Sequence, residues 1–208
     1  MFSMILAAGW PIWPLLASSV VALAIVIERY LSLTDAKIAP SGLAKAVIAN
    51  LQEGIPPPDS ILQLERNSLL GKVLASALIC RADDPLAKEA DVRAALHHAG
   101  RLAAQALETR LTTLATIASA APLMGLLGTV VGLIEIFGAQ SPGSVSGNPA
   151  QLAQGISIAL YNTAFGLIVA IPALVFWRYF RARADGYLLT LETGADQLLR
   201  RLNAMDTP

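Results

Sequence analysis

The chain has 208 residues, of which 55% are hydrophobic and only 14% are charged. Soluble globular domains carry nearer a quarter of charged residues, so this composition indicates a membrane protein. Fifteen basic residues balance fifteen acidic residues, which leaves no net charge to attract nucleic acid.

The charges are gathered in two segments of the chain. Residues 1–27 carry no charged side chain, and residues 112–177 carry only Glu135. Every lysine and arginine lies within residues 29–110 or 178–201. Basic residues that flank membrane spans stay in the cytoplasm, so we expect both basic segments there. Three spans satisfy this arrangement, with the N-terminus outside and the C-terminus inside.

The first predicted span begins near Ile12 and ends at the charged pair that follows Ile27. Tryptophans at its outer end and Tyr30 at its inner end are typical of the aromatic belts of membrane proteins. Residues 1–11 lack the basic start of a signal peptide, so no cleaved leader is expected.

Residues 31–111 have the polarity of a soluble helical domain. A short helix is predicted over residues 42–52, and one continuous helix over residues 59–81, starting at an Asp-Ser cap. The sequence Asp83-Asp84-Pro85 predicts that a further helix starts at Leu86. Because no strong breaker follows before Pro122, this helix is expected to run directly into the second span.

The second predicted span, residues 117–137, is long enough to cross a bilayer as a helix. Small residues recur along it every three or four positions, which predicts a face that packs closely against another helix. Glu135 places a carboxyl group inside this apolar run or at its edge, where an acid is rare enough to suggest a function. The small residues are Ala118, Ala121, Gly125, Gly128 and Gly132.

A polar connector leads to the third predicted span, residues 155–177, which has a small-residue face of its own. Pro172 is expected to kink this helix near its inner end. An amphipathic pattern then continues to about Leu202, so the second and third spans are parts of long helices. The face consists of Gly155, Ala159, Thr163, Gly166, Ala170 and Ala173.

No enzyme motif accompanies these spans, and neither a cofactor nor a metal site is expected. The adjacent His97 and His98 point about 100° apart on a helix, so they are poorly placed to bind one ion. Thr129 and Thr163 are the notable hydroxyls on the small faces. Each could simply bond a carbonyl of its own helix, but together with Glu135 they suggest a narrow polar seam.

Two segments resemble the signature helices of the MotA/TolQ/ExbB proton channel family. They are residues 122–132, PLMGLLGTVVG, and residues 155–172, GISIALYNTAFGLIVAIP. The length, the order of three spans and the Glu28-Arg29 pair after the first span are most similar to ExbB. The match is specific over residues 115–185 and rests on layout alone elsewhere.

The resemblance implies a homo-oligomer, a pentameric ring in the bacterial inner membrane, around the single spans of an ExbD-like partner. Proton flow would drive rotation and energise a TonB-like protein for outer-membrane import. The pore-lining threonines of the family correspond to Thr129 and Thr163, and its prolines to Pro122 and Pro172. The main proton carrier would be an aspartate of the partner.

The predicted fold is therefore an all-α membrane protein with three transmembrane helices, two of which continue as long cytoplasmic helices. The helix-packing residues are expected to be the two prolines with Gly125, Gly128, Gly132, Gly155, Ala159 and Gly166. The expected segments are residues 1–30 (periplasmic end and first span), 31–111 (cytoplasmic helical domain), 112–138 (second span), 139–153 (periplasmic loop), 154–177 (third span) and 178–208 (cytoplasmic C-terminal helix).

One position departs from the family pattern. The family's third span usually opens with Gly-Ile-x-Glu-Ala-Leu, and Ile158 occupies the position of the glutamate. The second and third spans are antiparallel, and Glu135 lies about as far from the outer end of its helix as Ile158 does from the outer end of its own. Glu135 is therefore a candidate to supply the missing acid. The alternative is that Glu135 only reaches the outer membrane interface.

Three other functions are weighed against an ExbB-like role. A TolQ-like subunit that maintains the cell envelope is the nearest alternative. A non-conducting scaffold that oligomerises through its small faces belongs to a different class. A flagellar stator is disfavoured because MotA has four spans and this chain has three.

Overall fold

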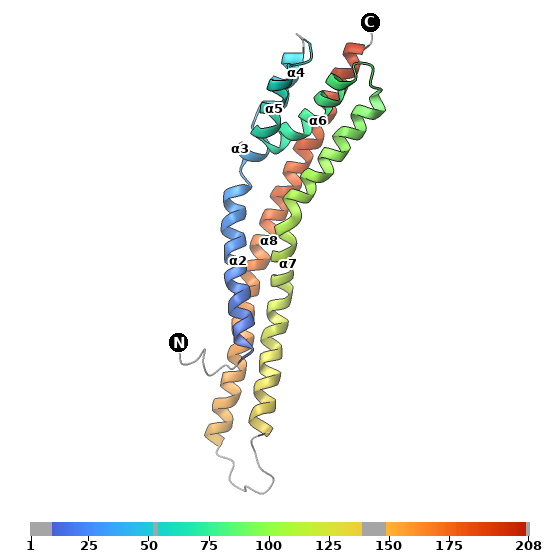
Figure 1. Cartoon of the computed structure of the whole chain (residues 1–208). Coiled ribbons are helices and arrows are strands. Elements are labelled where there is room, and N and C mark those ends of the chain that lie inside the picture. Colours follow the sequence, from blue (N-terminus) through green and yellow to red (C-terminus); the bar gives the residue numbers. More distant parts are fainter. Residues whose placement is uncertain (1–9, 52–53, 139–148, 207–208) are drawn as a thin grey trace. The chain divides into compact units, whose positions relative to one another are not determined.

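The computed structural model describes residues 10–51, 54–138 and 149–206. Every regular element within these ranges is an α-helix (Figure 1), which confirms the all-α prediction. The expected connector, residues 139–153, and the segment before Trp10 lie largely outside the described residues. The helices are α2 (Ile12–Ser32), α3 (Asp35–Ile38), α4 (Leu43–Asn50), α5 (Pro58–Asn67), α6 (Leu69–Asp83), α7 (Glu89–Gly138) and α8 (Pro149–Asp206).

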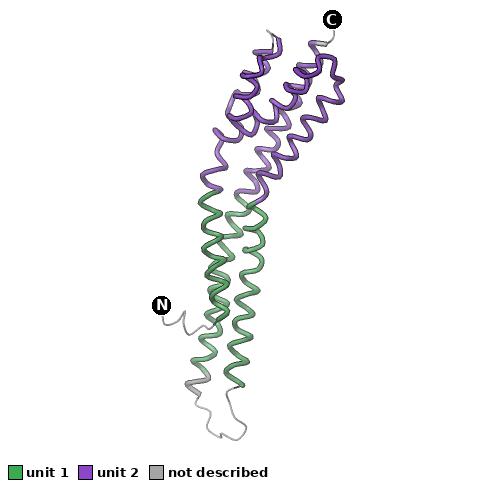
Figure 2. The backbone as a smooth tube through the Cα atoms, in the orientation of Figure 1, with its two compact units in different colours: residues 1–28, 110–179 green, residues 29–109, 180–208 purple. Residues whose placement is uncertain are grey.

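The chain divides into two compact units (Figure 2). Unit 1 consists of Met1–Glu28 and Arg110–Tyr179, and unit 2 consists of Arg29–Thr109 and Phe180–Pro208. The long helices α7 and α8 each have one segment in unit 1 and one segment in unit 2. The division follows the change from apolar to charged sequence, because unit 1 contains all of residues 1–27 and 112–177, which carry Glu135 as their one charged side chain.

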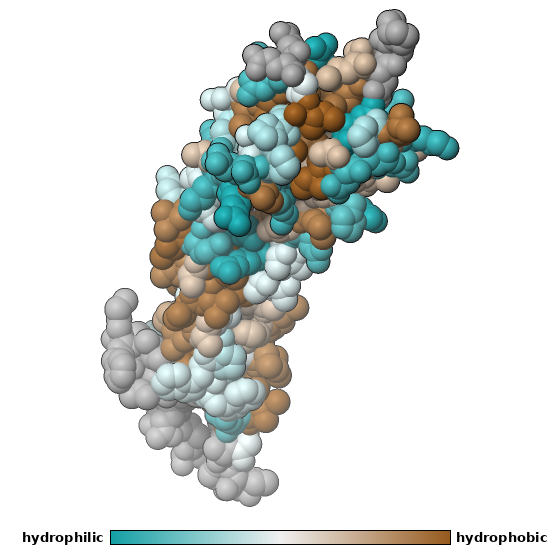
Figure 3. Space-filling model, turned by 45° about the horizontal axis from the view of Figure 1, so that its top comes forward, coloured by the Kyte–Doolittle hydropathy of each residue, from teal (hydrophilic) through white to brown (hydrophobic). Residues whose placement is uncertain are grey.

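Helices α2, α7 and α8 are each long and apolar enough to cross a membrane, which confirms the three predicted spans. Within the most apolar stretch of each helix, only 22% of the residues of α2 and 28% of those of α7 and of α8 are buried inside the chain. Large side chains such as Val20, Leu23 and Ile134 are therefore exposed, and lipid or neighbouring chains are expected to cover them. Figure 3 shows hydrophilic side chains gathered mainly over unit 2 on the face drawn.

The three spans meet in unit 1 around small side chains. Leu15 of α2, Ala121 of α7 and Ala170 of α8 form one buried cluster, against which Met124 and Val169 pack. Two of its three central residues are alanines, and small side chains let helix backbones come close together in a membrane.

Unit 2 has a core in which leucine predominates. Its large, fully buried side chains come mainly from α6, from α8 and from the segments that connect the shorter helices. They include Phe180, Leu33, Leu51, Leu74, Leu78 and Leu198.

The helix predicted over residues 59–81 is two helices, and this prediction is wrong. Ser68 has an extended backbone (φ −159°, ψ 167°), and its hydroxyl accepts a hydrogen bond from the Gly71 amide at 3.0 Å. Serine therefore acts as the N-cap of α6, and α5 ends at Asn67. The expected cap at Asp59 is also absent, because α5 starts at Pro58, after Pro57.

Helix α7 begins at Glu89, three positions after the predicted start at Leu86. The Asp84 carboxylate accepts the Leu86 amide at 2.9 Å, which forms a local turn before the helix. The Lys88 amide donates to the Asp91 carboxylate at 3.2 Å, at the start of the helix. Lys88 thus precedes the first helical residue, and Asp91 in the first turn of α7 accepts its amide.

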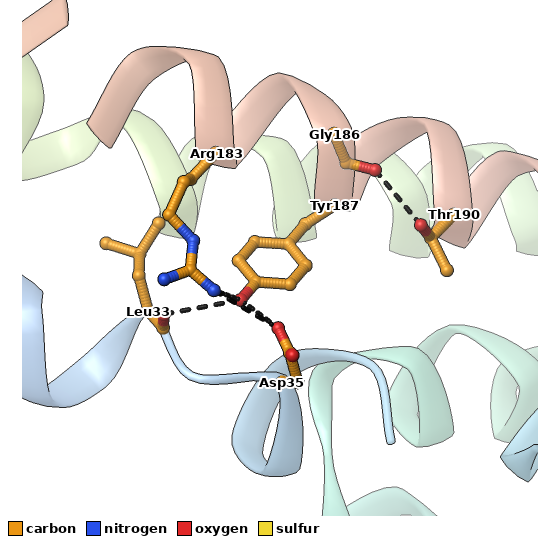
Figure 4. Close-up of polar contacts among 6 residues, drawn as sticks. All are labelled: Leu33, Asp35, Arg183, Gly186, Tyr187 and Thr190. Carbon is orange, nitrogen blue, oxygen red and sulfur yellow. Dashed lines mark hydrogen bonds and ion pairs between the residues drawn. The ribbon is translucent and has the colours of Figure 1, made fainter. Parts of the chain in front are cut away.

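A buried tyrosine, Tyr187, connects α8 to the segment between α2 and α3 within unit 2 (Figure 4). It lies on α8 beyond Trp177, where the apolar run of the third span ends. The Tyr187 hydroxyl donates to Asp35 Oδ1 at 2.5 Å and lies 3.3 Å from the Leu33 carbonyl oxygen. Arg183 Nη2 donates to the same hydroxyl at 2.7 Å. Burial, and then the hydrogen bond to Asp35, raise the pKa of Tyr187, so the phenol is neutral at physiological pH.

Tyr187→Phe is expected to lower the free energy of unfolding by about 1–2 kcal/mol, because the variant removes the hydroxyl that donates to Asp35 and accepts from Arg183. Urea unfolding in detergent, followed by circular dichroism, measures the loss. Tyr30→Phe is the matched control, since Tyr30 is 67% exposed. The advantage of wild type should be constant up to about pH 10, the ordinary phenol pKa. It should shrink as the pH rises through the raised pKa of Tyr187. An equal loss in both variants would contradict this account.

Candidate functional site

Helices α7 and α8 run antiparallel in unit 1 and touch backbone to backbone. A Cβ atom added to Gly125 would lie 2.7 Å from the Asn162 carbonyl oxygen and 3.0 Å from Thr163 Cα. One added to Gly166 would lie 2.6 Å from the Ala121 carbonyl oxygen. Real Cβ atoms do not approach a backbone oxygen so closely, so only glycine fits at both positions.

The same contact continues toward the C-terminal end of α7. A Cβ atom on Gly128 would lie 2.7 Å from Asn162 Cβ, and one on Gly132 would lie 3.2 Å from Ala159 Cβ. On the other helix, Gly155 faces the side chain of Ile136. We call this contact the seam, and its small residues are Gly125, Gly128, Gly132, Gly155, Ala159 and Gly166.

The two prolines lie differently from the small residues. Both helices continue through them, Pro122 in α7 and Pro172 in α8. Pro122 is half-buried, whereas Pro172 is exposed. A packing role for Pro172 therefore requires lipid or another chain.

The two threonines make different hydrogen bonds. Thr129 is 8% exposed, and its hydroxyl donates to the Leu126 carbonyl of its own helix at 2.6 Å. Thr163 donates across the seam to the Gly125 carbonyl oxygen at 3.3 Å. Thr129 therefore bonds a carbonyl of its own helix, as threonines in membrane helices often do, while Thr163 links the two helices.

Glu135 and Ile158 line one cavity of about 260 Å³ at the end of the seam. Gly128, Gly132, Gly155 and Ala159 also border it. Glu135 is exposed overall and Ile158 is half-buried. The carboxyl-bearing position of α7 thus faces the same space as the position of α8 at which a glutamate is expected.

Asn162 is a polar residue of the seam that the sequence analysis did not select. It is 1% exposed, and it lines the cavity beside Glu135. Its amide fills the space that Gly128 leaves, since a Cβ atom there would lie 2.9 Å from Asn162 Nδ2. An asparagine in an apolar span, next to Thr163, is the signal that could have found it.

The family model of the MotA/TolQ/ExbB proton channel family matches residues 65–193, which include the whole seam. The chain belongs to this family. Several curated relatives agree with the match. ExbB-like 3, a biopolymer transport protein from Synechocystis sp., is 33% identical over 94% of this chain and 93% of its own length.

Two further relatives match shorter stretches at higher identity. Biopolymer transport protein exbB1 of Vibrio cholerae is 43% identical over 40% of this chain and 36% of its own. ExbB-like 2 of Helicobacter pylori is 47% identical over 38% of this chain and 53% of its own. This chain is therefore a membrane protein of the proton channel class, similar to proteins named for biopolymer transport.

Among the residues that the structure describes, no group of three or more His, Cys, Asp or Glu side chains is placed to hold an ion. His97 lines a separate cavity of unit 2 that also contains Arg93 and Arg101. The polar side chains described along the seam and its cavity are the hydroxyls of Thr129 and Thr163, the amide of Asn162 and the carboxyl of Glu135.

Proposed function

We propose that this chain is the proton channel and motor subunit of an ExbB–ExbD–TonB-like complex in the bacterial inner membrane. The complex would couple the proton motive force to energy-dependent import across the outer membrane. The observation that carries the proposal is the seam, where Thr163 bonds across to Gly125 within a membrane-spanning helix pair. The family match and the names of the relatives support the same function.

The proposed assembly is a ring of five copies around the single spans of an ExbD-like partner, with a TonB-like protein as the element driven. Low burial within this chain supports it, because the outer faces of α7 and α8 are left for other chains. The basic segments support an orientation with the N-terminus in the periplasm and the C-terminus in the cytoplasm.

In the proposed mechanism, an aspartate on the partner's span carries the proton past the seam. A carboxyl group in lipid needs hydrogen-bond partners, since an unpaired polar group is costly there. Thr129 and Thr163 are the proposed partners on this chain. Each hydroxyl donates to a backbone carbonyl, so its oxygen lone pairs can accept a hydrogen bond from a protonated carboxyl.

Glu135→Gln is expected to reduce partner-dependent proton flux by about tenfold or more, if Glu135 supplies the outer acid of the path. Proteoliposomes that contain this chain and its single-span partner measure the flux with a pH-sensitive dye. Glu108→Gln in unit 2 is a control for loss of an acidic side chain. Unchanged flux in Glu135→Gln would assign Glu135 to the membrane interface alone.

A double substitution tests whether the acid can move between the helices. Because Glu135 and Ile158 line the same cavity, Ile158→Glu in the Glu135→Gln background should restore much of the flux. Flux that stays low although the double variant assembles would show that the two positions are not equivalent.

The cellular role is tested by deleting the gene in the organism that makes the chain. An ExbB-like role predicts loss of receptor-dependent uptake across the outer membrane, with an envelope that stays intact. A TolQ-like role predicts leakage of periplasmic proteins and sensitivity to detergent while uptake continues. Complementation with the wild-type gene is the control in both assays.

A further inference from the structure

The proposed path contains a gap between its acid and its hydroxyls. Glu135 and Thr129 are about 9 Å apart along α7, at about 1.5 Å per residue. A hydrogen bond between oxygens spans only about 2.8 Å. A proton therefore needs a bridging group or water to pass between the levels of Glu135 and Thr129 along α7.

Asn162 lies at the Thr129 end of this gap, because its side chain packs against Gly128, the residue before Thr129 on α7. It borders the same cavity as Glu135 and immediately precedes Thr163 on α8. Its side chain is 1% exposed, packed against the position where Gly128 has no Cβ atom. Gly128 thus makes room for an amide, and that amide is held at a fixed place between the two helices.

The chemistry of an amide suits a bridge but not a carrier. Its oxygen accepts hydrogen bonds and its nitrogen donates two, so it can orient water in both directions. An amide neither gains nor loses a proton at physiological pH, so the Asn162 side chain cannot itself carry the proton. The cavity of about 260 Å³ is large enough for water, which needs about 10–15 Å³ of such volume and two to four polar partners.

We propose that Asn162 is a positioning residue of the proton path, which orients water in the cavity that it shares with Glu135 and so extends the path from this acid toward the threonines. This inference rests on the proposed function, because it assumes that protons pass along the seam. It extends the path from the acid and the hydroxyls to the amide that joins them, and it explains why a large polar side chain opposes Gly128.

A matched pair of substitutions separates hydrogen bonding from packing. Asn162→Ser and Asn162→Ala differ by one hydroxyl and have nearly the same volume. If the side chain orients water, the serine variant should keep flux within about threefold of wild type, and the alanine variant should lose about tenfold. Asn162→Leu keeps the branched shape without polar groups and should also lose about tenfold. The flux is measured in proteoliposomes with the co-purifying single-span partner.

Thermal unfolding and the elution volume of the complex check that each variant assembles. If the alanine variant does not assemble, the serine and leucine variants decide the outcome. Equal flux in the serine and apolar variants, or wild-type flux in any apolar variant, would overturn the role of Asn162 and leave the channel function standing. Absence of partner-dependent flux in wild type would instead overturn the proposed function, and this inference with it.

Discussion

Gly166→Ala is expected to destabilise the helix pair by about 1–3 kcal/mol or more, the range measured for overpacked cores. The added Cβ would lie 2.6 Å from the Ala121 carbonyl oxygen and 3.1 Å from Gly125 Cα. Both of these atoms belong to the α7 backbone, which cannot rotate away as a side chain can. The helices must move apart, and the thermal unfolding midpoint in detergent should fall accordingly.

Gly186→Ala is the control for this substitution, because it introduces the same atom into the same helix. Nothing lies within 4 Å of a Cβ at Gly186, and alanine favours a helix over glycine by about 1 kcal/mol. The control should therefore be as stable as wild type or more stable. If Gly166→Ala were as stable as Gly186→Ala, the helices would be packed less closely at the seam than the backbone distances indicate.

Thr163→Val is expected to lower partner-dependent proton flux by about tenfold to a hundredfold while the complex still assembles. Valine has the shape of threonine but no hydroxyl, so the bond to the Gly125 carbonyl oxygen is lost together with the acceptor for a carboxyl proton. Thr129→Val should have a smaller effect, because the Thr129 hydroxyl is bonded within its own helix. Proteoliposome flux measures both variants.

Thr190→Val provides the baseline for loss of a threonine hydroxyl on α8. Its hydroxyl is exposed and donates to the Gly186 carbonyl of its own helix at 3.0 Å (Figure 4), away from the seam. A scaffold that only oligomerises should tolerate Thr163→Val as well as Thr190→Val. A non-conducting scaffold would pass no protons in wild type or in either variant. Equal, undiminished flux in Thr163→Val and Thr190→Val would instead show that the Thr163 hydroxyl is not part of the proton path.

Local patterns predicted the three membrane-spanning helices. Hydrophobic length, charge segregation and the spacing of small residues act over one helix at a time, so α2, α7 and α8 can be found without tertiary information. The shared level of Glu135 and Ile158 also followed from counting residues, because antiparallel helices rise by the same amount per residue. The cavity that both residues line agrees with this count.

Contacts between elements account for what the sequence analysis missed. The break at Ser68 lets α5 fold back onto α6. A single serine between the polar run Glu65-Arg66-Asn67 and the apolar run that follows does not by itself signal such a turn. Asn162 is buried because Gly128, on the other helix, leaves space for it. The register of two helices decides that pairing, as it decides which threonine bonds across the seam.

Proton flux into liposomes tests the central claim most directly. The chain is reconstituted alone, with its single-span partner, and with a partner whose membrane aspartate is replaced by asparagine. The account predicts rapid flux only with the unaltered partner, and loss of most of that flux in Thr163→Val. An assembled complex that passes no protons, or flux that persists without the partner, would contradict it.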